Sequence, residues 1–367
     1  MQEENEMRLI DCSGPPRERG RAHGRALRDE ITQTLSRWAN ATIKSGASEV
    51  EIDAYCETFV GGTGHIERAK TQTPGLYEEL RGIAEGAGQP FNRLAAFNLM
   101  DEQWWHDASF GKAPPGCSLI ASRIRGGNLL SQNMDLPEHL DGSQVVLRLS
   151  GPDIPDTILL SAAGLIGLTG ANSAGVAVGV NTLLMLHHDG EGLPVAFALR
   201  KALSALTAQE AAQALRETAH ASGQHYAIVT REDVLSFECS RGGCSPVTLP
   251  EKDTFLHTNH PLSSKDIDPE TQAVFEKAGF NAGSRIRLDW MQSRSDTLKD
   301  ASAVLTALDD PETPLCMQAH THDGSCTFAS VIYEMTTSPV IRMRRGIAGS
   351  GPWITIPFPQ IAAASAG

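Results

Sequence analysis

A cysteine follows a glycine and two prolines and begins an apolar, strand-like run. The stretch reads Pro114-Pro115-Gly116-Cys117-Ser118-Leu119-Ile120-Ala121-Ser122. The next apolar run ends in Asp135, so a carboxylate returns on the neighbouring predicted strand. A cysteine attacks carbonyl groups as the thiolate, and its ordinary pKa of about 8.5 means that it needs a base or a positive neighbour. This pattern is compatible with a nucleophile site, but on its own it favours a buried structural cysteine at the start of a strand.

The chain itself could supply the base by cutting the bond before Cys117. A freed α-amino group has a pKa of about 7.7–8.0, close to the pH at which a general base works best. Gly116 tolerates unusual backbone angles and leaves its carbonyl group open to the neighbouring thiol. Attack would give a thioester, which water then hydrolyses. Gly-Cys alone is a common dipeptide, so the prediction depends on its surroundings.

Two other functions compete with a cysteine nucleophile. Four histidines have spacings that can ligate zinc, which would suit a metal-dependent hydrolase: His257, His260, His320 and His322. These are weak patterns, and no Cys-x-x-Cys pair accompanies them. The other alternative is a non-catalytic binding protein, in which Cys117 would be unreactive and the chain uncut.

The bulk composition is that of a globular protein. The chain has 367 residues, of which 41% are hydrophobic and 20% charged. A formal net charge of -13 argues against nucleic acid or an anionic membrane surface as the main partner. The polar N-terminus does not resemble a secretory signal, and no apolar stretch approaches the roughly 20 residues that span a bilayer. Seven thinly spread cysteines favour reduced thiols and a cytoplasmic location over a disulfide framework.

The first third of the chain has helical periodicity, so residues 1–105 are expected to be essentially all helical. Predicted helices cover residues 17–45, 49–60, 73–86 and 90–105. Five arginines of the first helix alternate with acidic residues, which predicts a solvated helix face: Arg17, Arg19, Arg21, Arg25 and Arg28. Residues 106–116 are the expected linker.

Short strands and helices alternate in blocks beyond Gly116. Predicted strands cover 117–125, 128–134, 144–150, 157–163, 176–181, 226–230, 234–239, 254–258, 326–334 and 339–344. Predicted helices begin at 194, 207 and 269 and cover 284–293 and 297–308. Blocks of helices and strands, rather than strict alternation, predict an α+β fold of sheets covered by helices.

Several motifs occur in one order along the chain and together resemble a known family. They are residues 19–24 (RGRAHG), 79–88 (ELRGIAEGAG), 98–102 (NLMDE), 116–118 (GCS), 132–135 (QNMD), 170–175 (GANSAG), 192–195 (GLPV), 258–260 (TNH) and the pair Ser284 and Arg287. In this order they are similar to the acyl-coenzyme A:6-aminopenicillanic acid (isopenicillin N) acyltransferase family of N-terminal nucleophile hydrolases.

The resemblance implies a four-layer αββα sandwich of two antiparallel sheets covered by helices. It implies cleavage between Gly116 and Cys117, into a helical pro-segment (1–116) and a catalytic chain (117–367) that together form one domain. Cys117 would be the nucleophile and its freed amine the base. Asp135 would orient the site, and Asn259 would donate an N–H group to the oxyanion.

Further oxyanion or substrate contacts are implied at Asn133, Gly170, Asn172, Ser284 and Arg287. The segment 315–320 (LCMQAH) lacks the arginine expected after its cysteine. Ser284, Arg285 and Arg287 either replace that arginine or form an ordinary helix face.

The implied activity is cleavage or transfer of an acyl group through an acyl-Cys117 intermediate. The expected partner is a small-molecule acyl amide or thioester, with no cofactor or metal. Hydrolysis is favoured slightly, and an acyl-coenzyme A-dependent N-acyltransferase is the alternative. The two cleaved fragments should stay associated, and a homo-oligomer is compatible with the sequence.

Overall fold

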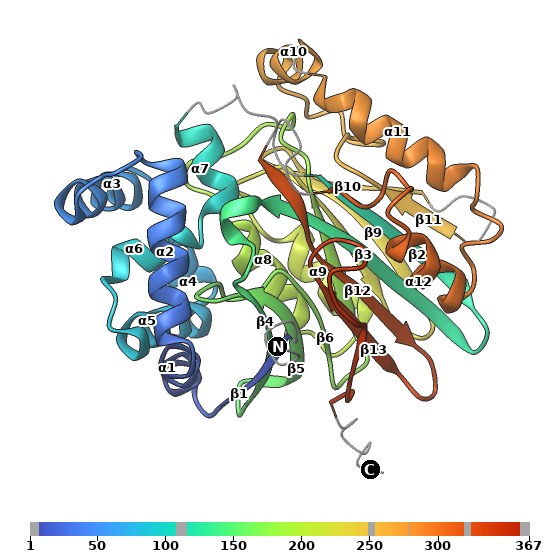
Figure 1. Ribbon diagram of the computed structural model, residues 1–367, viewed down its shortest axis with the longest axis horizontal. Helices are drawn as coiled ribbons and strands as arrows, with labels where there is room; N and C mark the ends of the chain where they lie inside the picture. Colours follow the sequence, from blue (N-terminus) through green and yellow to red (C-terminus); the bar gives the residue numbers. More distant parts are fainter. Residues whose placement is uncertain (1–6, 108–115, 249–253, 278, 319–323, 360–367) are drawn as a thin grey trace.

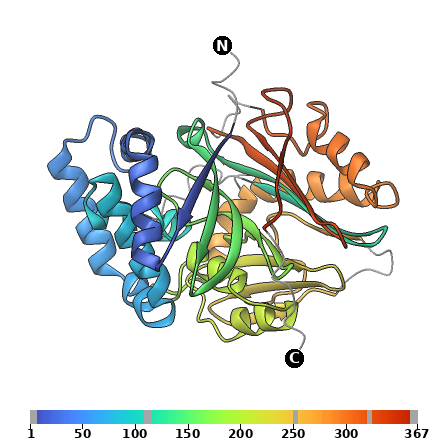
Figure 2. The same cartoon turned by 90° about the horizontal axis from the view of Figure 1, so that it is seen from below.

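A computed structural model describes residues 7–107, 116–248, 254–277, 279–318 and 324–359. Two β-sheets face each other in the centre, and helices cover the outer face of each sheet (Figures 1 and 2). A block of helices from the N-terminal third lies beside one end of this sandwich (Figure 1). The predicted α+β class and the four-layer αββα arrangement are confirmed.

The first sheet has eight strands in the order β1-β4-β5-β6-β7-β8-β9-β10. Their bounds are β1 (Arg8–Ser13), β4 (Gln144–Gly151), β5 (Ile154–Ala162), β6 (Thr169–Asn172), β7 (Ala177–Thr182), β8 (Gln224–Val229), β9 (Val234–Ser240) and β10 (Gly243–Pro246). All neighbours are antiparallel except β1 and β4, which run parallel. The prediction of purely antiparallel sheets is wrong at this one pair.

The second sheet has six strands in the order β11-β2-β3-β12-β13-β14. Their bounds are β2 (Cys117–Ile124), β3 (Gly127–Pro137), β11 (Thr254–His257), β12 (Ser325–Met335), β13 (Val340–Arg345) and β14 (Ile354–Ile356). β2 and β3 form a hairpin in which Cys117 lies opposite Met134. β12 pairs with β3, and Thr327 lies opposite Asp135. The register of this pair shifts between Thr327 and Ala329.

Within the described residues 7–107, seven helices precede the expected cleavage point. They are α1 (Pro16–Ala26), α2 (Arg28–Thr42), α3 (Glu49–Gly62), α4 (His65–Gln72), α5 (Pro74–Ala87), α6 (Phe91–Phe97) and α7 (Met100–His106). α8 (Val195–Leu203) and α9 (Ala208–Arg216) cover the first sheet, while α11 (Phe280–Gln292) and α12 (Ala301–Asp309) cover the second. α10 (Pro269–Lys277) packs on α11 (Figure 1), and η2 (Glu138–Leu140) is a short 3-10 turn. In the part of the chain that the structure describes, no helix is long and apolar enough to cross a bilayer.

Helices α1 and α5 cross at very close range because each carries two glycines one turn apart. A Cβ atom at Gly20 would lie 2.0 Å from the carbonyl oxygen of Glu79, and one at Gly82 would lie 2.2 Å from that of Arg17. The RGRAHG and GIAEGAG motifs therefore encode helix packing. The single helix predicted over 17–45 is wrong, because the backbone leaves helical geometry at Leu27 (ψ 26°) and starts α2 in a new direction.

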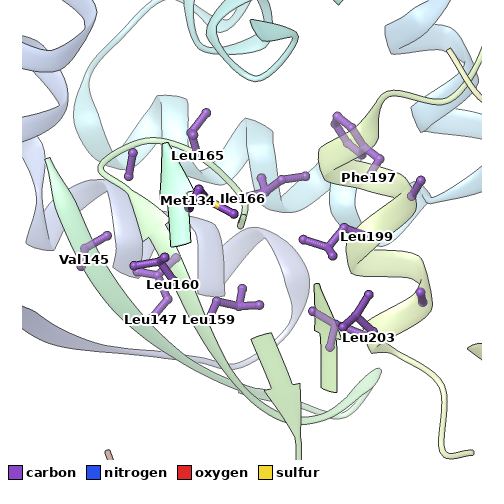
Figure 3. Packing of buried hydrophobic residues seen from close by; sticks show 14 of the residues in the cluster. Met134, Val145, Leu147, Leu159, Leu160, Leu165, Ile166, Phe197, Leu199 and Leu203 are labelled. Carbon is purple, nitrogen blue, oxygen red and sulfur yellow. The ribbon is translucent and has the colours of Figure 1, made fainter. Parts of the chain in front are cut away.

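One apolar core joins the N-terminal helices to both sheets. In Figure 3, Val145, Leu147 and Leu160 lie in this core on β4 and β5, with side chains of α8 across from them. The other labelled members of this cluster in Figure 3 are Met134, Leu159, Leu165, Ile166, Phe197, Leu199 and Leu203. A second cluster lies between the β2/β3 hairpin and helices α11 and α12 and includes Ile120, Leu129 and Met291. The first core therefore contains side chains from both sides of the expected cleavage point, which pack against each other.

A buried ion-pair network crosses the same boundary. Arg19 Nε donates to Glu79 at 2.8 Å, and Arg200 donates to Glu79 from the opposite side at 2.8 Å. Arg19 also pairs with Asp153. Burial alone would raise the pKa of Glu79, but the charges and hydrogen bonds of the two arginines lower it. The predicted solvated face is therefore wrong for Arg19, which is fully buried.

Three other expectations need correction. Residues 1–105 are not all helical, because β1 lies among them. β6, β10 and β14 were not predicted, and each has only three or four residues. The expectation of reduced thiols throughout is wrong for one pair, because a disulfide joins Cys239 to Cys244. Most of the expected linker 106–116, together with His320 and His322, lies outside the described residues.

Candidate active site

Cys117 occupies the first position of β2, which lies between β11 and β3 in the second sheet, and it is almost fully buried. Its backbone N–H donates to Oδ1 of Asn259 at 2.7 Å. Its carbonyl oxygen accepts a hydrogen bond from the Arg287 guanidinium, which also lies 3.2 Å from the Ser118 hydroxyl. The backbone on both sides of the Cys117 side chain is therefore fixed by residues far along the chain.

Asn259 is held at both polar atoms of its side chain and at its backbone N–H. Oδ1 accepts from Cys117 and from Nη2 of Arg287 at 2.8 Å, and Nδ2 donates to the carbonyl oxygen of Thr182 at 3.1 Å. Its backbone N–H donates to the Ser284 hydroxyl at 2.9 Å. Two donors face Oδ1, which fixes the orientation of the amide. One N–H of Nδ2 is used by Thr182, so the predicted oxyanion contact would use the other.

The scissile-bond candidate lies directly against Arg287. A Cβ atom added to Gly116 would be 2.6 Å from Nη2 and 3.1 Å from Cζ of that guanidinium. Arg287 cannot retreat easily, because three hydrogen bonds hold it against Cys117, Ser118 and Asn259. Gly116 is therefore required by this close approach. Burial lowers the pKa of Arg287, while the charge of Asp135 raises it.

Asp135 contacts the candidate bond through its backbone. Its N–H donates to the carbonyl oxygen of Gly116 at 2.9 Å, and its Oδ1 accepts from the Thr327 hydroxyl at 2.6 Å. Oδ2 is buried and has no hydrogen-bond partner. Burial raises the pKa of Asp135 to about 6, against the opposing effects of Arg287 and Thr327. The carboxylate is thus poised to take a proton near neutral pH.

The Cys117 thiol is strongly held in its protonated form. Burial, followed by the negative charge of Asp135, raises the pKa of Cys117 to about 12. Hydrogen bonds from the Asp135 N–H and the Gln132 side chain, and the charge of Arg287, act in the opposite direction. A thiol in this setting needs a base to become a nucleophile.

A buried histidine–carboxylate pair anchors the segment that carries Asn259. His257 Nε2 lies 2.9 Å from Glu238, and its Nδ1 lies 2.7 Å from the carbonyl oxygen of Thr258. Glu238 also accepts backbone N–H bonds from Leu262, Ser263 and Ser264. Burial would raise the pKa of Glu238, but these contacts lower it. The carboxylate therefore stays ionised and holds the turn after Asn259 in place.

Ser284 completes the support from helix α11. Its hydroxyl donates to Thr258 at 3.0 Å, accepts from the Asn259 N–H and lies 2.7 Å from Nδ1 of His260. Arg285, one position on, is exposed. Of the three helix residues considered from the sequence, the structure brings Ser284 and Arg287 to the cluster and leaves Arg285 on the outer face.

Helix α7 reaches the site indirectly through Thr182. Asp101 accepts from the Thr182 hydroxyl at 2.8 Å and from Gln224 at 2.7 Å, while the Thr182 carbonyl oxygen holds Asn259. Glu102 accepts from Ser222 at 2.8 Å. Burial and then the neighbouring Asp101 raise the pKa of Glu102 to about 7. The segment before Cys117 thus helps to position a residue after it.

Three predicted residues lie elsewhere. Asn133 is fully buried, donates to the Leu315 carbonyl oxygen at 2.9 Å and accepts from Ser330 at 2.6 Å. Asn172 bonds the carbonyl oxygens of Leu203 and Ala205, and its Oδ1 accepts N–H groups of its own turn. Gly170 packs against β5 and α8. None of these contacts involves Cys117, although Asn133 lies on β3 next to Met134, the strand partner of Cys117.

Sequence reasoning missed three supporting residues. They are Thr182, Thr327 and Glu238, which hold Asn259, Asp135 and His257. Each acts from a strand other than that of the residue it holds, and the local sequence around it has no distinguishing pattern. Gln132 did have a signal, because it lies in the QNMD motif.

The metal alternative gains no support from the described histidines. His257 uses both ring nitrogens within its own network, and His260 bonds Ser284. In the described ranges, neither histidine belongs to a group of three potential ligands. A cavity of about 320 Å³ lies beside β11, and its lining does not include Cys117, Asp135, Asn259 or Arg287. It is lined by Val247, Thr248, Thr254, Phe255, Leu256, Leu262, Gln292 and Ser295.

Comparison with known proteins decides the family. The family model described as "Acyl-coenzyme A:6-aminopenicillanic acid acyl-transferase" matches residues 125–343, more than half of the chain. The chain belongs to this family. The matched region contains Asp135, Asn259 and Arg287 and begins just after Cys117. Cys117 itself lies eight residues before the matched region.

One curated relative is the 40 kDa form of acyl-coenzyme A:6-aminopenicillanic-acid-acyltransferase from Emericella nidulans. It is 27% identical over 271 residues, which cover 71% of this chain and 72% of the relative. Two solved structures have low similarity. A mutant conjugated bile acid hydrolase from Clostridium perfringens gives a TM-score of 0.39 at 11% identity, covering 66% of this chain and 97% of its own. Penicillin V acylase from Agrobacterium tumefaciens gives 0.38 at 13% identity, covering 67% and 88%.

Proposed function

We propose that this acyl-transferase family member is an N-terminal nucleophile enzyme that activates itself by cutting the Gly116–Cys117 bond. The observation that carries the proposal is the double hold on that bond. Asn259 binds the N–H of Cys117 at 2.7 Å, and the Asp135 N–H binds the carbonyl oxygen of Gly116 at 2.9 Å. A donor on the scissile oxygen is what a tetrahedral intermediate at Gly116 needs.

Cleavage would begin with loss of the thiol proton to the Asp135 carboxylate. Cys117 Sγ attacks the carbonyl carbon of Gly116, and the Asp135 N–H stabilises the resulting oxyanion. The C–N bond breaks, and the amide nitrogen of Cys117 takes up the proton. A thioester between Gly116 and Cys117 remains, and water hydrolyses it to a Gly116 carboxylate, a free thiol and a free α-amine.

The mature enzyme would repeat this chemistry on an external substrate. The α-amine of Cys117 accepts the thiol proton, and the sulfur attacks the substrate carbonyl carbon. The remaining N–H of Asn259 Nδ2 donates to the oxyanion, with Oδ1 kept on the α-amine. The leaving amine or thiol departs with a proton, and the acyl group stays on Cys117 as a thioester.

Residues 1–116 would form the pro-segment and small subunit of this zymogen, and residues 117–367 the catalytic subunit. The shared core and the Arg19–Glu79–Arg200 network support continued association of the two fragments. A cytoplasmic location and a homo-oligomer remain expectations from the sequence.

The acyl acceptor decides between hydrolase and transferase. The name of the Emericella nidulans relative describes an acyltransferase and mentions acyl-coenzyme A and 6-aminopenicillanic acid. For this chain we propose an acyl amide or acyl thioester as donor, with water as the preferred acceptor and an amine as the alternative.

Intact mass under denaturing conditions tests the proposal. The wild-type protein should give two fragments, the larger starting at Cys117, and Cys117→Ala should remain one chain. An active wild-type enzyme that stays uncut would overturn self-processing. Incubation with a panel of acyl amides and acyl thioesters should add one acyl mass to the larger fragment, and hydroxylamine should remove it. Retained activity after treatment with a chelator is expected, whereas its loss would favour the metal-dependent alternative.

A further inference from the structure

Three potential metal ligands gather at the edge of the first sheet, and none of the three takes part in the proposed chemistry. Cys239 on β9 and Cys244 on β10 are direct cross-strand partners, with Cα atoms 4.0 Å apart and a disulfide between them. His220 Nε2 lies 3.4 Å from Sγ of Cys244. The three ligand atoms lie within 4.8 Å of one another, and among the described residues no other group of three has this property.

The cluster is built into the fold. Cys239 and His220 are almost completely buried, whereas Cys244 is half-buried on the edge strand and gives access from solvent. His220 is fixed by its backbone bridge to Leu193. Burial favours the neutral form of its imidazole, which is the form that ligates metals.

An oxygen atom lies beside these three potential ligand atoms as a fourth. The carbonyl oxygen of Leu215 lies 2.9 Å from Nε2 of His220 and 3.5 Å from Sγ of Cys244. It belongs to the last turn of α9, where carbonyl groups carry negative partial charge and favour a cation. Sulfur and nitrogen ligands of a tetrahedral zinc ion lie about 3.5–3.8 Å apart. The His220–Cys244 separation of 3.4 Å is close to the lower end of this range.

We propose that reduction of the Cys239–Cys244 disulfide creates a site for a soft divalent cation, with Zn²⁺ as the best fit. A dithiol or phosphine reductant supplies two electrons and two protons, which break the S–S bond and give two thiols. Zn²⁺ then binds both sulfurs as thiolates and releases the two thiol protons. His220 binds through Nε2 after its ring proton moves to Nδ1, and the Leu215 oxygen faces the fourth position.

The oxidised and metal-bound forms exclude each other, since both need the same two sulfurs. Metal binding at the β9–β10 edge is therefore controlled by redox state. Neither Cys117 nor Asn259 contributes to the site, so it can be tested whether or not the chain cleaves itself.

The test is a titration with Co²⁺, which reports thiolate ligation by charge-transfer absorption and tetrahedral geometry by its visible bands. The protein is compared in oxidised form and after phosphine reduction without oxygen, with thiols counted in both. Reduced protein should bind one Co²⁺, which Zn²⁺ displaces, and oxidised protein should bind none at this site. Cys244→Ser, a mild change on the edge strand, should remove most of the absorption, and His220→Asn should weaken binding at least tenfold.

Cys117→Ala is the matched cysteine control and should keep the full signal. The proposal is overturned if reduced wild-type protein gives no thiolate-to-cobalt absorption, or if Cys244→Ser keeps it. Failure of the disulfide to open in the folded protein would also overturn it, because the site would then never form. Full binding by His220→Asn would show that the histidine is not a ligand.

Discussion

Oδ1 of Asn259 accepts the backbone N–H of Cys117 at 2.7 Å, across 142 positions of sequence. A side-chain oxygen on that nitrogen is suited to both states of the proposed enzyme. In the uncut chain it orients the peptide bond, and in the cut chain it can accept from the α-amine that acts as base. The same residue therefore links processing to catalysis, and changes to its supports should affect both.

Gly116→Ala should block or greatly slow self-processing. The new Cβ atom would lie 2.6 Å from Nη2 of Arg287, so either the guanidinium or the scissile bond must move. A displacement near 1 Å in such a site costs on the order of a hundredfold in rate. Precursor purified in urea is diluted into native buffer, and intact mass follows the fragment that starts at Cys117.

Gly283→Ala is the control for this change. Gly283 lies in α11, the helix of Arg287, and its added Cβ would contact nothing within 4 Å. Alanine should stabilise the helix by up to about 1 kcal/mol and leave processing at the wild-type rate. Equal rates for both alanine variants would contradict the steric role of Gly116.

Arg287→Gln should lower the processing rate by on the order of a hundredfold, because Cys117 and Asn259 lose their shared donor. Arg287→Lys should rescue only part of the rate, since an ammonium group lacks the planar fork that serves several acceptors. Arg285→Gln on the exposed face of the same helix should process normally. The same urea-dilution assay measures all three, and a wild-type rate for Arg287→Gln would rule out this role.

Processing should depend on the ionisation of Asp135. Its pKa of about 6 means that the carboxylate is mostly ionised at pH 7 and mostly protonated at pH 5. If it takes the thiol proton, the rate should fall about tenfold per pH unit below 6. Asp135→Asn should stay uncut at every pH, while the exposed Asp156→Asn should keep the wild-type profile. A flat wild-type profile between pH 5 and pH 8 would exclude Asp135 as the base.

Glu102 should make the fold less stable as pH rises. Its folded-state pKa of about 7 exceeds the ordinary 4.5, so the native state binds the proton more tightly than the unfolded chain. Its contribution to stability is present below about pH 4.5 and is lost as pH rises through 7. Glu102→Gln should therefore match the parent at pH 4.5 and exceed it at pH 8, by on the order of 1–3 kcal/mol.

Urea unfolding of the uncut Cys117→Ala chain, with and without Glu102→Gln, measures this difference on a single polypeptide. The comparison between the two chains cancels the contributions of other titrating groups. A constant difference in free energy of unfolding from pH 4.5 to pH 8 would contradict the assignment.

Glu238→Gln should destabilise the fold by about 2–4 kcal/mol and slow processing. Glu238 now accepts hydrogen bonds from backbone N–H groups, and the NH2 group of a glutamine would face one of these donors without an acceptor. The substitution would also leave His257 without its carboxylate partner. Glu232→Gln, an exposed change before the same strand, should be neutral. Unfolding free energy and processing rate at low temperature are measured together. If the rate of folded Glu238→Gln equals that of wild type, the pair supports stability alone.

The strands of both sheets could largely be predicted, because their apolar runs are bounded by glycine turns. The Cys117–Asp135 relationship was also accessible, since adjacent runs form a hairpin. The break between helices α1 and α2 at Leu27 could not be predicted, because apolar residues recur at helical spacing on both sides of it. β1 was missed because the strand with which it pairs, β4, lies more than a hundred residues away.

The supports of the site could not be found from the sequence for a similar reason. Thr182 acts through a carbonyl oxygen, which every residue has, and Thr327 lies at a register shift that only strand pairing creates. The Cys239–Cys244 disulfide depends on a tight β9–β10 hairpin whose second strand has four residues. In each case a tertiary contact, and not a local pattern, selects the residue.

The parallel pairing of β1 with β4 has a consequence for how the cleaved protein could refold. Once the bond before Cys117 is cut, an edge strand of the first sheet belongs to a different polypeptide from its neighbour. If the cleaved protein unfolds, its two fragments must find each other again before they can refold. This bimolecular step competes with aggregation through the unpaired sheet edge. Cleavage would therefore make unfolding effectively irreversible.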